Sequence, residues 1–405
     1  MLEPCGKSRI AYAQEQGSAG NVQGEKDAHL LAEKAYAEGS SLESQGAAES
    51  LSKAIGKYEE ALRLYRTAGD RRGEGETLNQ LGWIQARLGE KQKALDYYNK
   101  ALPLWRAVSD RGGEAKTLNN IGAVYNSLAE MQKALNYYDQ ALPLMRAVSD
   151  RGEEAKSLNN IGAVYISLGE MQKALNYYDQ ALPLMRAVGD RGGEARMLNN
   201  IGAVYNSLGE RQKALDYYNE ALPLWRAVGD RGGEALTLDK IGLVYNSLDE
   251  KQKALDYYNQ ALQQMRAMGD RGGEAVTLDN IGKVYDSLGE GQKALDYYNQ
   301  ALQHMRAMGD RSGEAKTLLC IAKAQSGLGK LLDARSTIQS AISIIEFLRM
   351  TIVSPEQRSS YIAATQDYYE FSINLLRQLH KLYPDRGYDR EALQTVESAR
   401  AQPVR

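Results

Sequence analysis

The sequence has few of the residues that most often carry chemistry. Its two cysteines, Cys5 and Cys320, are too few for a disulfide framework or for a zinc site built on cysteine pairs, and they suit a reducing compartment. The three histidines, His29, His304 and His380, stand far from one another and from paired carboxylates, so no metal-ligating spacing can be written. We therefore expect no metal and no other cofactor.

An excess of one charge and long apolar runs are missing as well. The 50 lysine and arginine residues nearly balance the 52 aspartate and glutamate residues, so no global field attracts a phosphate backbone and nucleic acid is not an expected partner. No apolar run approaches the roughly 18 to 20 residues that cross a bilayer, and residues 1–25 lack the apolar stretch of a secretory signal. We expect a cytoplasmic protein with no membrane partner.

What the sequence does contain is an internal repeat of 40 residues. Segments 113–152 and 153–192 differ at five of 40 positions. A shared period of this length predicts a stack of identical supersecondary units. We expect a flexible N-terminus (1–25), a degenerate first repeat (26–72), six strong repeats (73–312), a degenerate last repeat (313–349) and a C-terminal helical cap or linker (350–405).

Each repeat shows two stripes of apolar residues at helical spacing, which predict two amphipathic helices. In the second strong repeat the first stripe includes Leu118 and Ile121, and the second includes Ala134 and Tyr138. A Leu-Gly-Glu break separates the helices in most copies, and glycine there can close a helix in the left-handed conformation. The Gly-Asp-Arg-Gly-Gly connector between repeats offers aspartates as N-caps of the next helix, namely Asp110, Asp150, Asp190, Asp230 and Asp270.

Small residues and prolines occupy fixed places in the repeat. Gly122 and Ala134 would allow the two helices to approach closely. Pro143 and its equivalents fall inside the second helix and predict a kink there, whereas Gln263 and Gln303 at the same position predict straighter helices. For Tyr-Tyr pairs such as Tyr137-Tyr138, core packing is a better interpretation than an aromatic binding platform.

The repeat resembles the tetratricopeptide repeat, with leucine in place of that family's first tryptophan, in the series Leu118, Ile121, Gly122, Tyr125, Leu128, Ala134, Tyr138 and Ala141. The usual unit has 34 residues, and 40-residue units are similar to those of the adaptor LGN and, less closely, of kinesin light chains. Both are peptide-binding scaffolds. The resemblance implies an all-α, right-handed superhelical solenoid of antiparallel helix pairs, closed by C-terminal capping helices.

The chain from about Phe347 onward differs from the repeats. Ser354-Pro355-Glu356-Gln357 predicts a helix start, and helices are expected to about Leu382 and over residues 388–401. The segment 349–401 resembles the helical linker that joins tetratricopeptide repeats to the caspase-like peptidase domain in bacterial CHAT proteins. The catalytic histidine and cysteine of that family lie downstream of the linker, so no position here corresponds to them.

In tetratricopeptide arrays the first helix of each pair lines the concave surface. That resemblance implies a partner-binding surface for side chains on the exposed side of these helices. Two readings of the amides stay open, because they could instead support the neighbouring repeat or simply face water. The expected partner-binding residues are Asn79, Asn119, Asn120, Asn159, Asn160, Asn199, Asn200, Asp239, Asp279, Asn280, Lys116, Lys156 and Arg196.

Differences between the near-identical repeats concentrate on the same side of the first helix. One such series is Trp83, Ala123, Ala163, Ala203, Leu243 and Lys283. Variation at these positions could tune a groove for one partner, or it could be drift on a solvated face. His304 and Cys320 lie on different predicted helices with no orienting residue, so we expect no nucleophile and base there.

The function that these observations favour is a non-catalytic scaffold that binds a protein or peptide segment on the concave surface. A first alternative is the regulatory or sensor arm of a CHAT-type peptidase whose catalytic domain is absent from this chain. A second alternative is self-assembly into a homo-oligomer through the terminal repeats, because near-identical repeats can stack end to end.

Overall fold

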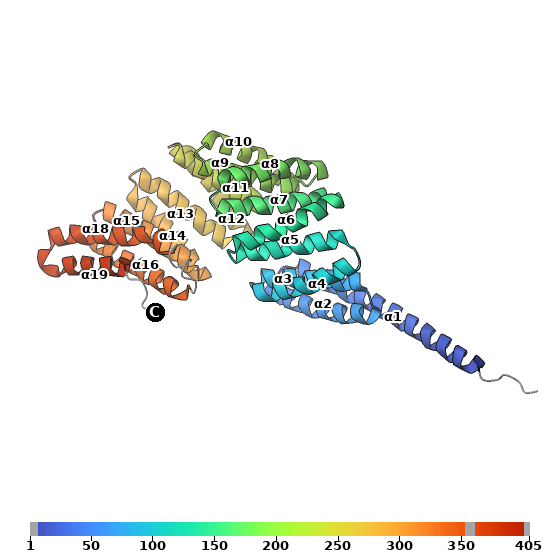
Figure 1. Cartoon of the computed structure of the whole chain (residues 1–405). Helices are drawn as coiled ribbons and strands as arrows, with labels where there is room; N and C mark the ends of the chain where they lie inside the picture. The colour runs from blue at the N-terminus through green and yellow to red at the C-terminus, as the bar shows by residue number, and fades with distance from the viewer. Residues whose placement is uncertain (1–6, 353–360, 401–405) are drawn as a thin grey trace, which may run out of the picture. The chain divides into compact units, whose positions relative to one another are not determined.

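The computed structural model describes residues 7–352 and 361–400, and within these ranges every regular element is a helix (Figure 1). Consecutive helices pair along the chain, as the repeat pattern predicts. The predicted start at Ser354-Pro355 lies outside the described residues. The helices are α1 (Lys7–Ser44), α2 (Ala48–Ala68), α3 (Arg71–Arg87), α4 (Lys91–Ala107), α5 (Arg111–Ser127), α6 (Met131–Ala147), α7 (Arg151–Ser167), α8 (Met171–Val188), α9 (Arg191–Ser207), α10 (Arg211–Val228), α11 (Arg231–Ser247), α12 (Lys251–Met268), α13 (Arg271–Ser287), α14 (Gly291–Met308), α15 (Arg311–Gly327), α16 (Leu331–Thr351), α18 (Gln366–Leu382), the 3-10 helix η1 (Pro384–Arg386) and α19 (Tyr388–Arg400).

The chain divides into two compact units, Met1–Met197 and Leu198–Arg405. The N-terminal unit begins with α1, whose helical backbone starts at Lys7, so the division that we expected after residue 25 lies inside a helix. None of the described helices combines the length and the apolarity that a membrane span requires.

Each first helix starts at an aspartate N-cap. The Asp110 side chain accepts a hydrogen bond from the backbone N–H of Gly113 over 2.9 Å, and this bond lowers the pKa of the Asp110 carboxyl. The same bond recurs at all the other predicted caps and also at Asp70 and Asp310. An arginine near the end of each second helix pairs with a glutamate in the next first helix, as Arg146 Nε does with Glu154 Oε1 at 2.6 Å. Each connector between repeats is therefore fixed by two interactions, the aspartate N-cap and the arginine–glutamate ion pair.

The break inside each repeat uses the left-handed conformation that the sequence predicts. Gly169 has φ 76° at this place, and glycines in most other repeats behave alike. Two repeats place other residues there, Ala129 with φ 59° and Asp249 with φ 64°. Because a side chain makes this conformation unfavourable, these two turns carry backbone strain.

Close packing of the two helices depends on glycine in the first helix. A Cβ atom added to Gly122 would lie 2.7 Å from the ring of Tyr138, which is 1% exposed. Tyr138 is therefore a core residue, whereas its neighbour Tyr137 is half-buried and stacks on Tyr125 with ring centroids 5.4 Å apart. The interpretation of the tyrosine pairs as packing residues is confirmed.

The second helices continue through their prolines. Pro143 lies in the second-last turn of α6 and is exposed. Asp139, the residue whose backbone carbonyl loses its helical donor, is exposed as well. Because water can reach that carbonyl, the missing hydrogen bond costs less than it would in a core. Helices α8 and α10 contain proline, and α12 has glutamine, yet all three have 18 residues. The predicted difference in straightness stays a prediction.

The last repeat is covered by the C-terminal helices. Leu318 and Ile338 of α15 and α16 share one apolar cluster with Leu375 and Leu379 of α18 and with Tyr388 of α19. Arg335 of α16 is bound by Glu391 of α19, with Nη2 and Oε2 2.7 Å apart. The apolar side of the final pair is thus buried by helices that do not follow the repeat pattern.

Candidate functional site

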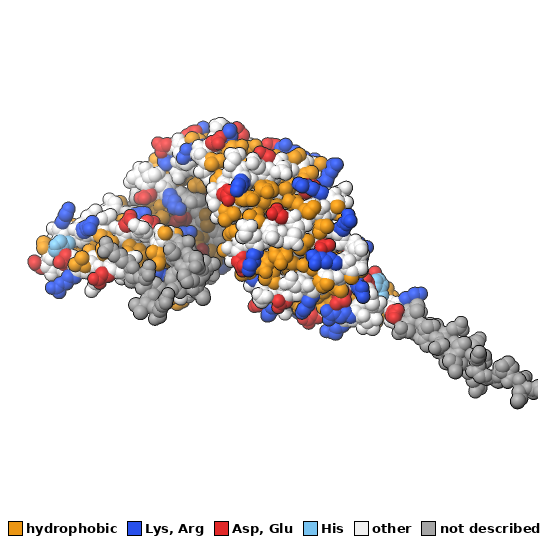
Figure 2. All heavy atoms as spheres, in the orientation of Figure 1, with side chains coloured by type: hydrophobic (Ala, Val, Ile, Leu, Met, Phe, Trp, Pro, Cys, Tyr) orange, Lys and Arg blue, Asp and Glu red, His pale blue; other side chains and the backbone are white. Residues whose placement is uncertain are grey.

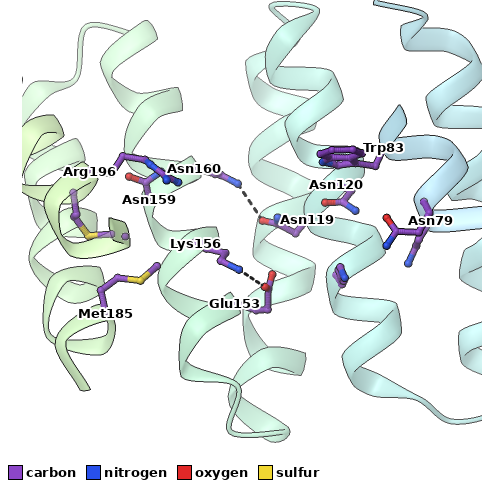
Figure 3. A pocket seen from close by; sticks show the side chains of 14 residues that line it. Asn79, Trp83, Asn119, Asn120, Glu153, Lys156, Asn159, Asn160, Met185 and Arg196 are labelled. Atoms are coloured by element: carbon purple, nitrogen blue, oxygen red, sulfur yellow. Dashed lines mark hydrogen bonds and ion pairs between the residues drawn. The ribbon is translucent and has the colours of Figure 1, made fainter. Parts of the chain in front are cut away.

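The first helices of the N-terminal unit line a cavity of about 370 Å³ (Figure 3). Its walls come from α3, α5, α7 and the first turns of α9, with one methionine from α8. These helices are positioned by their caps and by the glycine contacts described above. The lining residues are Asn79, Gln80, Trp83, Lys116, Asn119, Asn120, Glu153, Lys156, Asn159, Asn160, Met185, Gly193, Arg196 and Met197.

A second cavity of about 320 Å³ continues the first one along α3 and α5. The two share Trp83 and three asparagines, Asn119, Asn120 and Asn160, and the second adds Arg87 and Lys91 at its far end. We call the residues that line the two cavities the groove. Eight of the thirteen residues expected from the sequence line it, namely Asn79, Asn119, Asn120, Asn159, Asn160, Lys116, Lys156 and Arg196.

Asn79 and Asn119, the first asparagines of two repeats in the groove, are turned toward the neighbouring repeat. Asn79 is 6% exposed, and its Oδ1 accepts a hydrogen bond of 2.9 Å from the Thr117 hydroxyl one repeat later. Asn119 is also buried, and its Oδ1 accepts from Asn160 Nδ2 at 3.4 Å (Figure 3). Of the two readings that the sequence left open, the geometry favours support of the next repeat for Asn79 and Asn119. The reason is that this position faces the following helix rather than solvent.

Asn120, Lys116 and Arg196 line the first cavity without a partner from the rest of the described chain. Asn120 is half-buried, and Lys116 and Arg196 are exposed. Within the part of the chain that the structure describes, no hydrogen bond or ion pair engages these three side chains. Lys156 differs, because its Nζ lies 2.7 Å from Glu153 Oε1 in the same helix (Figure 3). One repeat therefore offers a ligand an amide donor and acceptor in Asn120 and a cation in Lys116, and the repeat of α9 offers a second cation in Arg196.

Trp83 is the main groove residue that was absent from the expected set. Its side chain is 36% exposed, and the guanidinium carbon of Arg87 lies 4.6 Å from the ring centroid. The signal was present in the sequence, since this position varies between otherwise identical repeats. Nothing in the sequence placed a cavity beside it. Glu153, Gly193 and the two methionines Met185 and Met197 were missed for the same reason.

The equivalent positions of the C-terminal unit are engaged between repeats. Asn199 Nδ2 donates to the Thr237 hydroxyl at 2.7 Å. Asp239 is 8% exposed and accepts from the Thr277 hydroxyl at 3.0 Å and from Asn280 Nδ2 at 3.3 Å. Burial raises the pKa of the Asp239 carboxyl, although both hydrogen bonds oppose that effect.

The remaining expected residues of this unit are Asp279 and Asn200. Asp279 Oδ2 lies 2.6 Å from Lys283 Nζ, and its Oδ1 is 3.4 Å from the Thr317 hydroxyl. Asn200 is half-buried. Asp279 therefore shares the inter-repeat role of Asp239, and the expected ligand-facing role is weaker here than in the groove.

His304 and Cys320, considered above as base and nucleophile, lie on α14 and α15. His304 Nε2 lies 3.6 Å from Glu274 Oε2. Burial raises the pKa of the Cys320 thiol to about 11, which leaves little thiolate at neutral pH. Among the described residues, no group of three or more histidine, cysteine, aspartate or glutamate side chains could hold a metal ion.

Solved structures with similar folds include three helical-repeat proteins. A Signal Transduction ATPase with Numerous Domains from Pyrococcus horikoshii, which has a tetratricopeptide repeat sensor, is 15% identical with a TM-score of 0.60, and the match covers 87% of this chain and 52% of that one. A Rap protein complexed with competence and sporulation factor is 15% identical with a TM-score of 0.57, over 93% and 99% of the two chains. The apo form of the quorum sensor NprR from B. thuringiensis is 15% identical with a TM-score of 0.52, over 81% and 100%. At these identities the likeness shows the fold alone.

Sequence comparison identifies the family. No curated protein matches the chain in sequence. The family model for the tetratricopeptide repeat matches residues 46–107, 113–187, 193–267 and 253–307, which together cover more than half of the chain. These segments include the helix pairs that build the groove. The chain belongs to the tetratricopeptide repeat family.

Proposed function

We propose that the groove binds an extended segment of a partner protein. The observation that carries this proposal is the cavity lined by Asn120 and Lys116 of one repeat and by Arg196 two repeats later, three polar side chains that no other described residue engages. An asparagine amide both donates and accepts, so it can bond the backbone of an extended peptide whatever its side chains. The first asparagines, Asn79 and Asn119, keep the repeats in register behind this surface.

The similar structures support a role in binding. The protein from Pyrococcus horikoshii carries its repeats as a sensor, NprR is a quorum sensor, and the Rap protein was solved with a bound factor. The same arrangement of helix pairs in this chain offers a surface of the same kind. The identity of the partner is a separate question, which the groove chemistry addresses below.

We propose that binding occurs without a reaction. Glu153, the carboxylate of the groove, is paired with Lys156. Ser127, the one aliphatic hydroxyl among the groove-lining residues, donates to the backbone carbonyl of Val124 at 2.7 Å. A nucleophile activated by a neighbouring base is the usual minimum for covalent catalysis, and the groove-lining residues do not supply that arrangement.

The sensor arm of a CHAT-type peptidase stays a prediction that rests on the resemblance of segment 349–401. Binding in the groove is compatible with it, because a sensor arm also needs a ligand surface. Self-assembly through the terminal repeats likewise stays a prediction. Neither alternative changes the residues that we assign to the groove.

A photo-crosslinking amino acid at position 120 tests the proposal in cells of the source organism. Asn120 faces the groove, whereas the control position Asn99 is exposed on α4 and lies outside it. We expect a discrete crosslinked partner from position 120 and none from position 99, with the crosslinked segment identified by mass spectrometry. The same partner captured equally from both positions, or no partner from position 120, would contradict the proposal.

A further inference from the structure

The groove is basic although the chain as a whole carries a net charge of -2. Its lining includes three cations at one end, Lys116, Lys156 and Arg196, and two at the other, Arg87 and Lys91. The single carboxylate among the lining residues, Glu153, is already occupied by Lys156. A cleft lined by one sign of charge concentrates ligands of the opposite sign.

Between the two basic ends lies Trp83, which lines both cavities. Arg87 lies over its ring, and the indole remains 36% exposed, whereas Trp105 and Trp225 are 4% exposed in the core. An exposed tryptophan beside a cavity gives a ligand side chain a large planar surface, and aromatic rings pack on such surfaces by offset stacking or edge-to-face contact. Figure 3 shows the indole of α3 near Asn120 of α5, and both residues line both cavities.

The equivalent residues in the next three repeats are alanines, Ala123, Ala163 and Ala203. Since the fold tolerates alanine at this position three times, packing of the repeat does not require the indole. Trp83 therefore provides an exposed aromatic ring at one place on the groove, where its two cavities meet.

We propose that the segment accepted by the groove is acidic and that it places an aromatic side chain against Trp83. This inference rests on the proposed function. The acidic side chains of the segment meet the basic groups at the two ends, the Asn120 amide bonds its backbone, and the aromatic side chain sits between the two ends on the indole.

Three fluorescein-labelled, terminally blocked peptides test the inference by anisotropy with the full chain. They are Glu-Asp-Phe-Asp-Glu, Glu-Asp-Ala-Asp-Glu and Lys-Arg-Phe-Arg-Lys. Each is measured with the wild type, with Trp83→Ala, and with Trp225→Met as a matched control. Trp225 is in the core, and four other repeats have methionine at that position, so this variant removes a tryptophan without touching the groove.

We expect the acidic phenylalanine peptide to bind most tightly to the wild type, and the basic peptide to bind at least about tenfold more weakly. Exchange of phenylalanine for alanine should weaken binding about fivefold in the wild type and in Trp225→Met. In Trp83→Ala the two acidic peptides should bind equally. Higher salt should weaken both acidic peptides, because the groove cations are exposed.

Equal binding of acidic and basic peptides would overturn the charge assignment. A phenylalanine effect that persists in Trp83→Ala would overturn the assignment of Trp83. If position 120 crosslinks to a partner but no acidic peptide binds, this inference fails while the proposed function stands. If neither binding nor crosslinking occurs, both fail.

Discussion

The turn between α5 and α6 contains an alanine in the left-handed backbone conformation, which is unfavourable for a residue with a Cβ atom. Ala129 has φ 59°, while Gly169 occupies the same place one repeat later with φ 76°. A Cβ atom at Gly169 would meet nothing within 4 Å, so exchange between glycine and alanine here changes backbone preference and no packing. The two sites therefore form a reciprocal test of one physical effect.

We expect Ala129→Gly to stabilise the protein by about 0.5 to 1 kcal/mol. The left-handed conformation costs an L-residue roughly 1 to 2 kcal/mol relative to glycine. Against this, glycine gains freedom in the unfolded chain, which offsets roughly 0.4 to 1 kcal/mol. Gly169→Ala should destabilise by a similar amount, and the double variant should resemble the wild type, because each exchange moves the strain to the other turn.

Urea unfolding at 25 °C, followed by circular dichroism and by tryptophan fluorescence, measures these changes. Trp105 is buried in the same unit and reports its unfolding. The midpoint should rise for Ala129→Gly and fall for Gly169→Ala with an unchanged slope. A lower midpoint for Ala129→Gly at unchanged slope would show that this turn is not strained. The explanation of the breaks inside the repeats would then be wrong.

Three further changes test the packing between helices and between repeats. Asp239→Asn should stabilise by on the order of 1 kcal/mol at pH 7, because the folded-state pKa of this buried carboxyl is raised. The Asp239 carboxyl stabilises the wild type below its unfolded-state pKa, and this contribution is lost as the pH rises through its folded-state pKa. The stability gained by Asp239→Asn should therefore vanish in acid. A gain in melting temperature that does not depend on pH would refute this. Gly122→Ala should destabilise by about 1 to 3 kcal/mol through contact with the Tyr138 ring, whereas Gly56→Ala, with open space around it, should stabilise by up to about 1 kcal/mol. Equal urea midpoints for these two variants would contradict the packing argument. Ser157→Thr should stabilise the protein by about 0.5 to 1 kcal/mol. The buried Ser157 hydroxyl has no hydrogen-bond partner, whereas Thr117 at the same position of another repeat donates to Asn79 of the preceding repeat. An unchanged or lower melting temperature would count against this role of the threonine.

The features that depend on neighbours within one repeat could be predicted from the sequence. The aspartate caps, the left-handed glycines and the small residue at Gly122 all act over a few residues or across one helix pair. These interactions are local, and the six near-identical repeats show the same residues at the same positions. For the same reason the ends of α18 and α19 near Leu382 and Tyr388 follow from the turn residues between them.

The features that depend on how one repeat sits on the next could not be predicted. Asn119 and Asn120 are adjacent in the sequence, yet the first bonds the next repeat and the second faces the groove. A helical wheel gives the angle between them but not the position of the following helix. Trp83 was visible as a variable residue, but the cavity beside it is built by residues of several successive repeats.

The central claim is that the groove of the N-terminal unit binds the partner. The most direct measurement is calorimetric titration of the segment that crosslinks to position 120 into Lys116→Glu/Arg196→Glu and into the control Lys93→Glu/Lys100→Glu, whose lysines are exposed on α4 outside the groove. The account predicts at least about tenfold weaker binding for the groove variant, since each reversal replaces attraction by repulsion, and a change of less than about twofold for the control. Equal affinities for the two variants would contradict it.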